Sequence, residues 1–177
     1  IDRLHKAGAV FDQPKLDSFQ RHYVKQLSVE ELATKLGAFL DEQDLEKPAD
    51  PQFSRLITIL HDRLGRFDEF PALTVWAKNV VEYSTEQLMF RKSNREATAK
   101  GLGTAIAAFE AAAENSWGSI DSLSTQLAAV VADQLLTNGD VFWPVRMALT
   151  GLDQSPSPAE CLWVLGRAES LRRLNIA

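Results

Sequence analysis

The sequence of 177 residues contains few of the residue types from which chemical sites are usually built. It has one cysteine, Cys161, and three histidines, His5, His22 and His61, at spacings that match no metal-binding motif. A single thiol cannot form an internal disulfide, which favours a reducing, cytoplasmic setting. Glycine-rich phosphate loops, His-x-x-x-His pairs and serine nucleophile elbows are also absent. The sequence therefore predicts no catalytic residue and no metal site.

Long apolar runs are missing as well. The longest near-apolar window, around residues 105–113, is interrupted by Glu110, whereas a bilayer-spanning helix needs about 20 consecutive apolar residues. We therefore expect no association with a membrane. The segment from Ile1 to Lys6 carries no signal-peptide pattern, and the chain does not begin with methionine. We interpret the chain as a piece of a longer protein.

The net charge of −5, from 19 basic and 24 acidic residues, argues mildly against non-specific binding of nucleic acid. The charge is unevenly distributed along the chain. Residues 29–53 contain two lysines and seven acidic residues, and residues 104–139 contain four acidic residues and no basic one. The rest of the chain is therefore neutral to basic. Ordinary solvated helix faces are the simplest explanation of this pattern.

Helix signals dominate the sequence. Three capping boxes are predicted, at Ser28-Val29-Glu30-Glu31, Ser93-Asn94-Arg95-Glu96 and Ser157-Pro158-Ala159-Glu160, and apolar residues follow the first at helical spacing. No stretch alternates between apolar and polar residues for long enough to predict a sheet. The expected fold class is all-α, with two helical subdomains that meet near residues 83–95. Helices are predicted over residues 29–40, 51–64, from 70 to about 80, 94–113, 120–135 with Ser119 as cap, 140–150, 158–166 and 167–174.

Three stretches of the sequence are too particular to be generic helix. They are Val10–Asp17 with Tyr23–Ser28, then Leu60–Phe70, and then Pro144–Gly151 followed by Leu165-Gly166 and Leu171–Leu174. In this order they resemble the C-terminal part of bacterial-type glutamyl-tRNA synthetase, a class I aminoacyl-tRNA synthetase. The resemblance covers nearly the whole chain, although the middle of it matches mainly in pattern.

The resemblance implies a domain organisation and a set of partners. Residues 1–28 would be the tail of a stem-contact region, and residues 29–85 and 86–177 two helical subdomains that form an anticodon-binding cage. The partners would be the anticodon loop of tRNA(Glu) and the missing N-terminal catalytic domain of the same polypeptide. That domain would attach glutamate to tRNA with ATP and magnesium, so this part needs no cofactor and catalyses nothing by itself. We expect a monomer in the cytoplasm.

The resemblance also assigns RNA-binding residues. Arg63 falls where such enzymes place the arginine that reads the last anticodon base, which is C in glutamate tRNAs and G in glutamine tRNAs. A guanidinium only donates hydrogen bonds, which suits the O2 and N3 acceptors of cytosine and not the N–H donors of guanine. Arg146 corresponds to the arginine of the second subdomain that faces the anticodon loop. Ser155, Pro156 and Pro158 lie in the loop that packs on splayed anticodon bases.

Each of these residues also has an ordinary structural explanation. Arg63, near a helix end, could satisfy terminal carbonyl groups. Arg146 could form an ion pair with Asp140 or Asp153, and Ser155-Pro156 could be a plain turn. Two other functions stay open, namely the anticodon-binding part of a class I lysyl-tRNA synthetase and an all-helical protein-interaction scaffold. A scaffold would give no reason for the candidate residues to converge on one surface.

Other side chains are expected to be structural. Trp76, Trp143 and Trp163 are predicted to be core anchors, whereas Trp117 lies in a turn and could be exposed. Cys161, on an apolar helix, is expected to be an inert buried thiol. Arg172 and Arg173 are expected on the solvated face of the last helix.

Overall fold

The computed structural model of the chain describes residues 12–177, which form helices and loops without a strand. The all-α fold predicted from the sequence is therefore confirmed. None of these helices has the length and apolar character that a membrane crossing requires. The α-helices are α1 (Gln13–Gln26), α2 (Val29–Glu42), α3 (Gln52–Leu60), α4 (Phe70–Lys78), α5 (Arg95–Ala111), α6 (Ile120–Asp133), α7 (Asn138–Thr150) and α8 (Pro158–Leu174). Three short 3-10 helices are η1 (Phe67–Glu69), η2 (Thr85–Leu88) and η3 (Glu114–Gly118).

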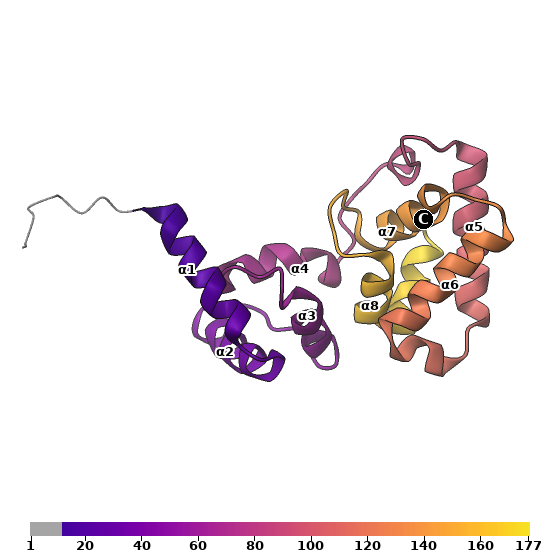
Figure 1. Cartoon of the computed structure of the whole chain (residues 1–177). Helices are drawn as coiled ribbons and strands as arrows, with labels where there is room; N and C mark the ends of the chain where they lie inside the picture. The colour runs from indigo at the N-terminus through magenta and orange to yellow at the C-terminus, as the bar shows by residue number, and fades with distance from the viewer. Residues whose placement is uncertain (1–11) are drawn as a thin grey trace, which may run out of the picture.

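The helices gather in two groups (Figure 1). The N-terminal group comprises α1 to α4, and α1 extends outward from it. The C-terminal group comprises α5 to α8. The chain passes from one group to the other after α4, through a segment that includes η2 and leads to α5. The two groups lie side by side, so that α3 and α4 face α7 and α8.

The N-terminal group is organised around α2 and α3. The predicted capping box begins α2, because Ser28 Oγ accepts from the Glu31 amide at 3.2 Å and the Glu31 carboxylate accepts from the Ser28 amide at 2.8 Å. Phe53 of α3 packs edge-to-face on Phe70 of α4, with ring centroids 5.9 Å apart. The fully buried side chains of this core are Leu32, Leu36, Leu40, Leu56, Ile57 and Leu64.

The C-terminal group depends on a close crossing of α5 and α7. A Cβ atom at Gly101 would lie 2.0 Å from the backbone carbonyl oxygen of Asp140, so only glycine permits this approach. Asp140 also caps α7, since its Oδ2 accepts from the amide and hydroxyl of Thr137 at 2.8 and 2.6 Å. The Ser93 hydroxyl donates to its other oxygen. Hydrogen bonds from Ser93 and Thr137 lower the pKa of the Asp140 carboxyl.

Two predicted helix starts differ from the structure. The cap of α5 is Asn94 and not Ser93, because the Asn94 side chain accepts from the Ala97 amide at 2.9 Å. Helix α7 begins at Asn138 and not at Asp140, since Thr137 and Asp140 form a reciprocal capping box. An aspartate in the third position of the box closes it as the usual glutamate does.

Helix α8 is broken in the middle, as the sequence predicts. Gly166 has φ of 72° and ψ of 174°, values that are not helical and that favour glycine. The first half of α8 begins at the predicted capping box of Ser157 and Glu160. The second half carries Arg173 into the space between the two groups.

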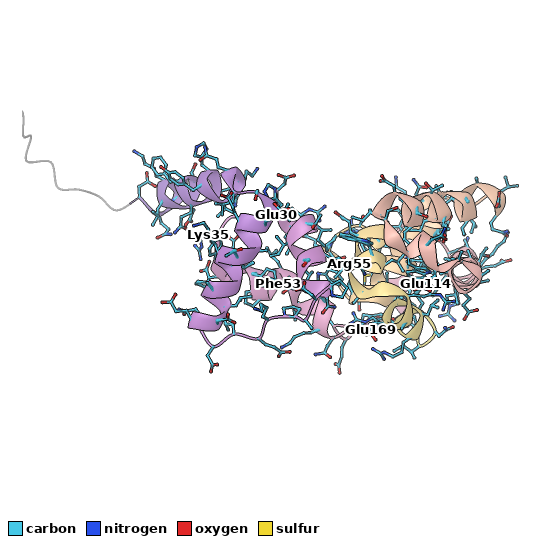
Figure 2. The ribbon with its side chains drawn as sticks, turned by 90° about the horizontal axis from the view of Figure 1, so that it is seen from below. Glu30, Lys35, Phe53, Arg55, Glu114 and Glu169 are labelled. Carbon is cyan, nitrogen blue, oxygen red and sulfur yellow. The ribbon has the colours of Figure 1, made fainter. Side chains whose placement is uncertain are left out.

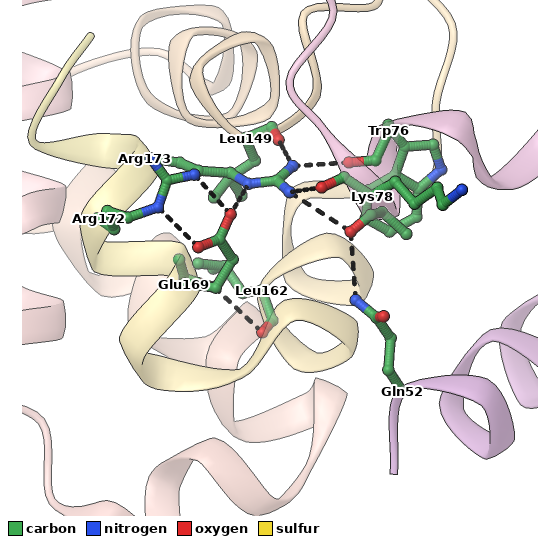
Figure 3. A network of polar contacts seen from close by, with 10 residues as sticks. Gln52, Trp76, Lys78, Leu149, Leu162, Glu169, Arg172 and Arg173 are labelled. Atoms are coloured by element: carbon green, nitrogen blue, oxygen red, sulfur yellow. Dashed lines mark hydrogen bonds and ion pairs between the residues drawn. The ribbon is translucent and has the colours of Figure 1, made fainter. Parts of the chain in front are cut away.

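The Arg173 side chain is completely buried, so the expectation that it lies on a solvated face is wrong. Its guanidinium donates to the carbonyl oxygens of Trp76 at 2.6 Å and Leu149 at 2.7 Å, and more weakly to those of Ala77 and Lys78 at 3.4 Å (Figure 3). These carbonyls end α4 and α7, where the helix dipoles favour a positive charge. One arginine therefore holds both groups together.

A second arginine crosses between the groups. Arg55 of α3 donates to the Trp163 carbonyl oxygen at 2.6 Å, and its guanidinium carbon lies 5.2 Å from the centre of the Trp163 ring. Figure 2 shows Arg55 between α3 and α8. The groups are thus joined by polar and cation–π contacts in addition to apolar packing.

Candidate nucleic-acid interface

Arg63 lies in the turn that follows α3, where its amide donates to the Leu60 carbonyl oxygen at 2.8 Å. Its side chain does not cap that helix. Nη2 instead donates to Glu160 of α8, at 2.9 Å from Oε1 and 3.3 Å from Oε2. The Arg63 side chain is 48% exposed, and within residues 12–177 Nε and Nη1 have no acceptor. The ion pair therefore leaves donors of the guanidinium available to a ligand.

Arg63 borders a cleft of about 280 Å³ between the two helix groups, which we call the Arg63 cleft. Ser155 and Pro156 form the opposite side, so three of the five candidate residues meet in one place. Its walls combine apolar surfaces with a few polar groups, as a site for an unstacked base requires. The lining residues are Leu60, Arg63, Ala72, Leu73, Trp76, Leu152, Gln154, Ser155 and Pro156.

The loop that carries Ser155 and Pro156 is held by the end of α7. Gly151 ends this helix in the left-handed region with φ of 70°, and a Cβ atom there would lie 1.8 Å from the Val81 carbonyl oxygen. The Thr150 hydroxyl accepts from the Leu152 amide at 3.1 Å and lies 3.4 Å from the Ser155 hydroxyl. These contacts fix one side of the Arg63 cleft before any ligand arrives.

Arg146 and Pro158 line a different hollow, of about 450 Å³, which we call the aromatic hollow. The Arg146 guanidinium carbon lies 4.7 Å from the centre of the Trp143 ring. Its Nη2 donates to the backbone carbonyl of Asp153 at 2.8 Å, so Arg146 pairs with neither of the two aspartate side chains considered from the sequence. Pro158 is buried at the start of α8. The lining residues are Phe90, Asn138, Gly139, Phe142, Trp143, Arg146, Ser157 and Pro158.

Two aromatic residues of this hollow, Phe90 and Phe142, were not predicted from the sequence, and Trp143 was predicted to be a core anchor. Phe90 and Trp143 pack with ring centroids 5.5 Å apart, and both line the hollow beside Phe142. The consecutive pair Phe142-Trp143 just before Arg146 was the available signal. Trp117, whose exposure the sequence left open, is 4% exposed and packs on Phe109, so it belongs to the core.

The start of α8 separates the two cavities. Ser155 and Pro156 face the Arg63 cleft, Ser157 and Pro158 face the aromatic hollow, and Glu160 pairs with Arg63. Each cavity thus combines an arginine with apolar or aromatic surface. This arrangement suits hydrogen bonding to base edges and stacking on base faces.

No arrangement for metal or covalent chemistry accompanies these cavities. Among residues 12–177, no group of three or more His, Cys, Asp or Glu side chains is placed to hold a metal ion. Cys161 is buried, as predicted, and burial raises the pKa of its thiol far above the ordinary range. Cys161 is therefore an unreactive thiol, as expected from the sequence.

Comparisons with known proteins agree on the family. The family model for the anticodon binding domain matches residues 23–177. Glutamate–tRNA ligases from Clostridium novyi (strain NT) and Herpetosiphon aurantiacus are each 30% identical to this chain and cover 98% and 100% of it. The chain spans 36% of the length of each of these relatives.

Solved structures show the same fold. A glutamate tRNA ligase from Elizabethkingia meningosepticum, in complex with its amino acid, superposes with a TM-score of 0.79 at 19% identity over 98% of this chain and 33% of that one. A glutamate–tRNA synthetase from Elizabethkingia anophelis gives a TM-score of 0.73 with the same identity and coverage. The family model, the relatives and the fold are consistent with one another. Because the family model matches most of the chain, the chain belongs to the anticodon-binding domain family.

Proposed function

We propose that this chain recognises the anticodon loop of tRNA(Glu) as the C-terminal, anticodon-binding part of a glutamate–tRNA ligase. The observation that carries the proposal is the Arg63 cleft, where Arg63, Ser155 and Pro156 converge from distant parts of the chain. Membership of the anticodon-binding family and the similarity to glutamate–tRNA ligases over the whole chain support it.

The Arg63 cleft would receive the last anticodon base. Either Nε or Nη1 of Arg63, together with the second N–H of Nη2, would donate to O2 and N3 of cytosine. Guanine would place N–H donors against the same donors, leaving buried polar groups without partners, which is costly. Pro156 would pack on the face of the base, and the Ser155 hydroxyl could donate or accept at its edge.

The aromatic hollow would receive a second unstacked base. Phe142 and Trp143 offer aromatic faces, and Arg146 adds a positive charge beside them. Stacking on aromatic side chains tolerates every base, because every base has a π-face. We therefore assign affinity to the aromatic hollow and discrimination to the Arg63 cleft.

The proposal includes the rest of the enzyme. Residues 29–85 and 86–177 would be the two anticodon-binding subdomains, and residues 1–28 the tail of the stem-contact region, of which residues 1–11 lie outside the described part. A catalytic domain of the same polypeptide would use ATP and magnesium to attach glutamate to the tRNA. The whole would act as a cytoplasmic monomer.

The two alternatives are less well supported. The two relatives named above are glutamate–tRNA ligases, which favours this enzyme over a class I lysyl-tRNA synthetase. A protein-interaction scaffold would not require Arg63, Ser155 and Pro156 to share one cleft.

The test is binding of the chain to two anticodon stem-loops, CUC and CUG, measured by fluorescence anisotropy over a series of salt concentrations. We expect CUC to bind more tightly by roughly 5- to 150-fold, the equivalent of ~1–3 kcal/mol for a good bidentate base contact. Affinity for both RNAs should fall as salt rises, because phosphate contacts release counterions. Substitution Arg63→Gln should bring the two affinities close together.

The matched control is Arg172→Gln, which removes an exposed arginine that contacts Glu169, away from both cavities. It should keep the preference for CUC. Equal affinities of the unaltered chain for both RNAs, or no binding to either at low salt, would contradict the proposed function.

A further inference from the structure

The carboxylate of Glu160 takes part in two contacts at once, the capping box of α8 and an ion pair with Arg63. Its Oε2 accepts from the Ser157 amide at 2.7 Å, and the Glu160 amide donates to Ser157 Oγ at 3.2 Å, which closes the capping box of α8. Its Oε1 accepts from Arg63 Nη2 at 2.9 Å, across 97 positions of the chain. One side chain thus connects the start of α8 with the arginine of the other helix group.

In the ion pair of Arg63 and Glu160, the two side chains differ in exposure and in how firmly they are held. The Glu160 side chain is only 15% exposed and is held by a backbone amide, whereas the Arg63 side chain is 48% exposed. Arg63 lies in a turn after the end of α3, and its other donors have no acceptor within residues 12–177. A long side chain in such a place would sample many rotamers if nothing held its head group. Glu160 is therefore the anchor and Arg63 the anchored group.

We propose that Glu160 is a positioning residue that sets how well Arg63 distinguishes the last anticodon base. This inference rests on the proposed function. By binding Nη2, Glu160 holds the guanidinium at the rim of the Arg63 cleft, and the remaining N–H groups are left for the base. Discrimination requires donors in a fixed place, because a mobile guanidinium can turn away from the N–H groups of guanine and lose little.

The charge of Glu160 has the opposite effect on affinity. A carboxylate near bound RNA repels phosphate groups, so its removal should strengthen binding of any RNA. Loss of positioning should weaken CUC binding relative to CUG binding. A change in the CUC-to-CUG ratio therefore reports positioning, whereas a parallel change in both affinities reports charge alone.

Two substitutions separate these effects. Glu160→Gln removes the charge and keeps a side chain that can close the capping box. Glu160→Asp keeps the charge but withdraws the carboxylate by one methylene from Arg63. An aspartate can also close such a box, as Asp140 does for α7. If one variant fails to fold, the other still tests the inference. Thermal unfolding of each variant would reveal a folding defect.

We expect both variants to lower the preference for the CUC stem-loop by roughly three- to tenfold, a part of what a good base contact supplies. In the Glu160→Gln variant the affinity for CUG should stay the same or rise. The control is Asp62→Asn, which removes the same charge beside Arg63 from a side chain that contacts His61 and not Arg63. It should leave the ratio unchanged.

The outcomes distinguish this inference from the proposed function. If the unaltered chain prefers CUC and both Glu160 variants keep that preference in full, Glu160 does not position Arg63. If Glu160→Gln and Asp62→Asn raise both affinities in parallel, Glu160 acts through charge alone and the positioning role is overturned. An unaltered chain without preference contradicts the proposed function, and the Glu160 inference falls with it.

Discussion

Arg173 and Trp76 are 97 positions apart in the sequence, yet Arg173 Nη1 donates to the Trp76 carbonyl oxygen at 2.6 Å. This hydrogen bond attaches the last turn of α8 to the end of α4. The same nitrogen donates to the Leu149 carbonyl oxygen at the end of α7. Trp76 also lines the Arg63 cleft, so the wall of the candidate site and the joint between the helix groups share one residue.

Arg173→Met should therefore destabilise the protein strongly. The substitution removes hydrogen bonds to four buried or half-buried carbonyls and to Glu169, at a cost of roughly 2–4 kcal/mol in the free energy of unfolding. Arg172→Met is the matched control, because Arg172 contacts the same glutamate from an exposed position. Its effect should be much smaller, because an exposed ion pair contributes little to stability. Urea unfolding of both variants would show this difference, and equal effects would contradict the joint described for Arg173.

Two glycines of α5 should respond to alanine in opposite directions. Gly101→Ala would place a methyl group 2.0 Å from the Asp140 carbonyl oxygen, so we expect a loss of about 1–3 kcal/mol as α5 and α7 separate. Gly103 has no atom within 4 Å of the corresponding position. Gly103→Ala should stabilise the protein by roughly 0.4–1 kcal/mol, because alanine favours the helix. Thermal unfolding of the two variants is the measurement, and a stable Gly101→Ala variant would mean that the helices do not cross this closely.

The stability of the protein should depend on Glu169 at low pH. Hydrogen bonds from Arg172 and Arg173 lower the pKa of this carboxyl from its ordinary value of 4.5 to about 2. In the unfolded protein this carboxyl takes up a proton at higher pH than in the folded protein. The contribution of Glu169 to the free energy of unfolding is therefore present above about pH 5 and is lost as pH falls toward 2. The difference in unfolding free energy between the unaltered chain and Glu169→Gln should therefore shrink between pH 6 and pH 3. A difference that is independent of pH would rule out this linkage.

Sequence patterns predicted local structure well because the interactions that create it are local. The capping boxes at Ser28 and Ser157 and the break at Gly166 each depend on residues within a few positions of one another. The start of α7 was placed two residues late, because an aspartate stands where the usual pattern has a glutamate or glutamine. These features follow from short-range chemistry, and the sequence displays them directly.

The candidate site was harder to predict, because its geometry depends on residues far apart in the chain. The resemblance nominated Arg63, Ser155 and Pro156, but no spacing in the sequence reveals that Arg63 would pair with Glu160. Arg173 was assigned to the solvent because arginine is almost never fully buried unless its charge is paired. Its burial could be recognised only once the ends of α4 and α7 were seen to supply carbonyl partners.

The buried position of Arg173 also determines when the contact between the two helix groups can form during synthesis of the chain. A ribosome that adds about 5–20 residues per second needs roughly 5–20 s to extend the chain from Trp76 to Arg173, since 97 positions separate the two. During that interval the end of α4 has no guanidinium to bind. Closure of such a long loop comes late in folding because it carries a large entropic cost. The nascent anticodon-binding surface is therefore completed only when the last turn of α8 has left the ribosome.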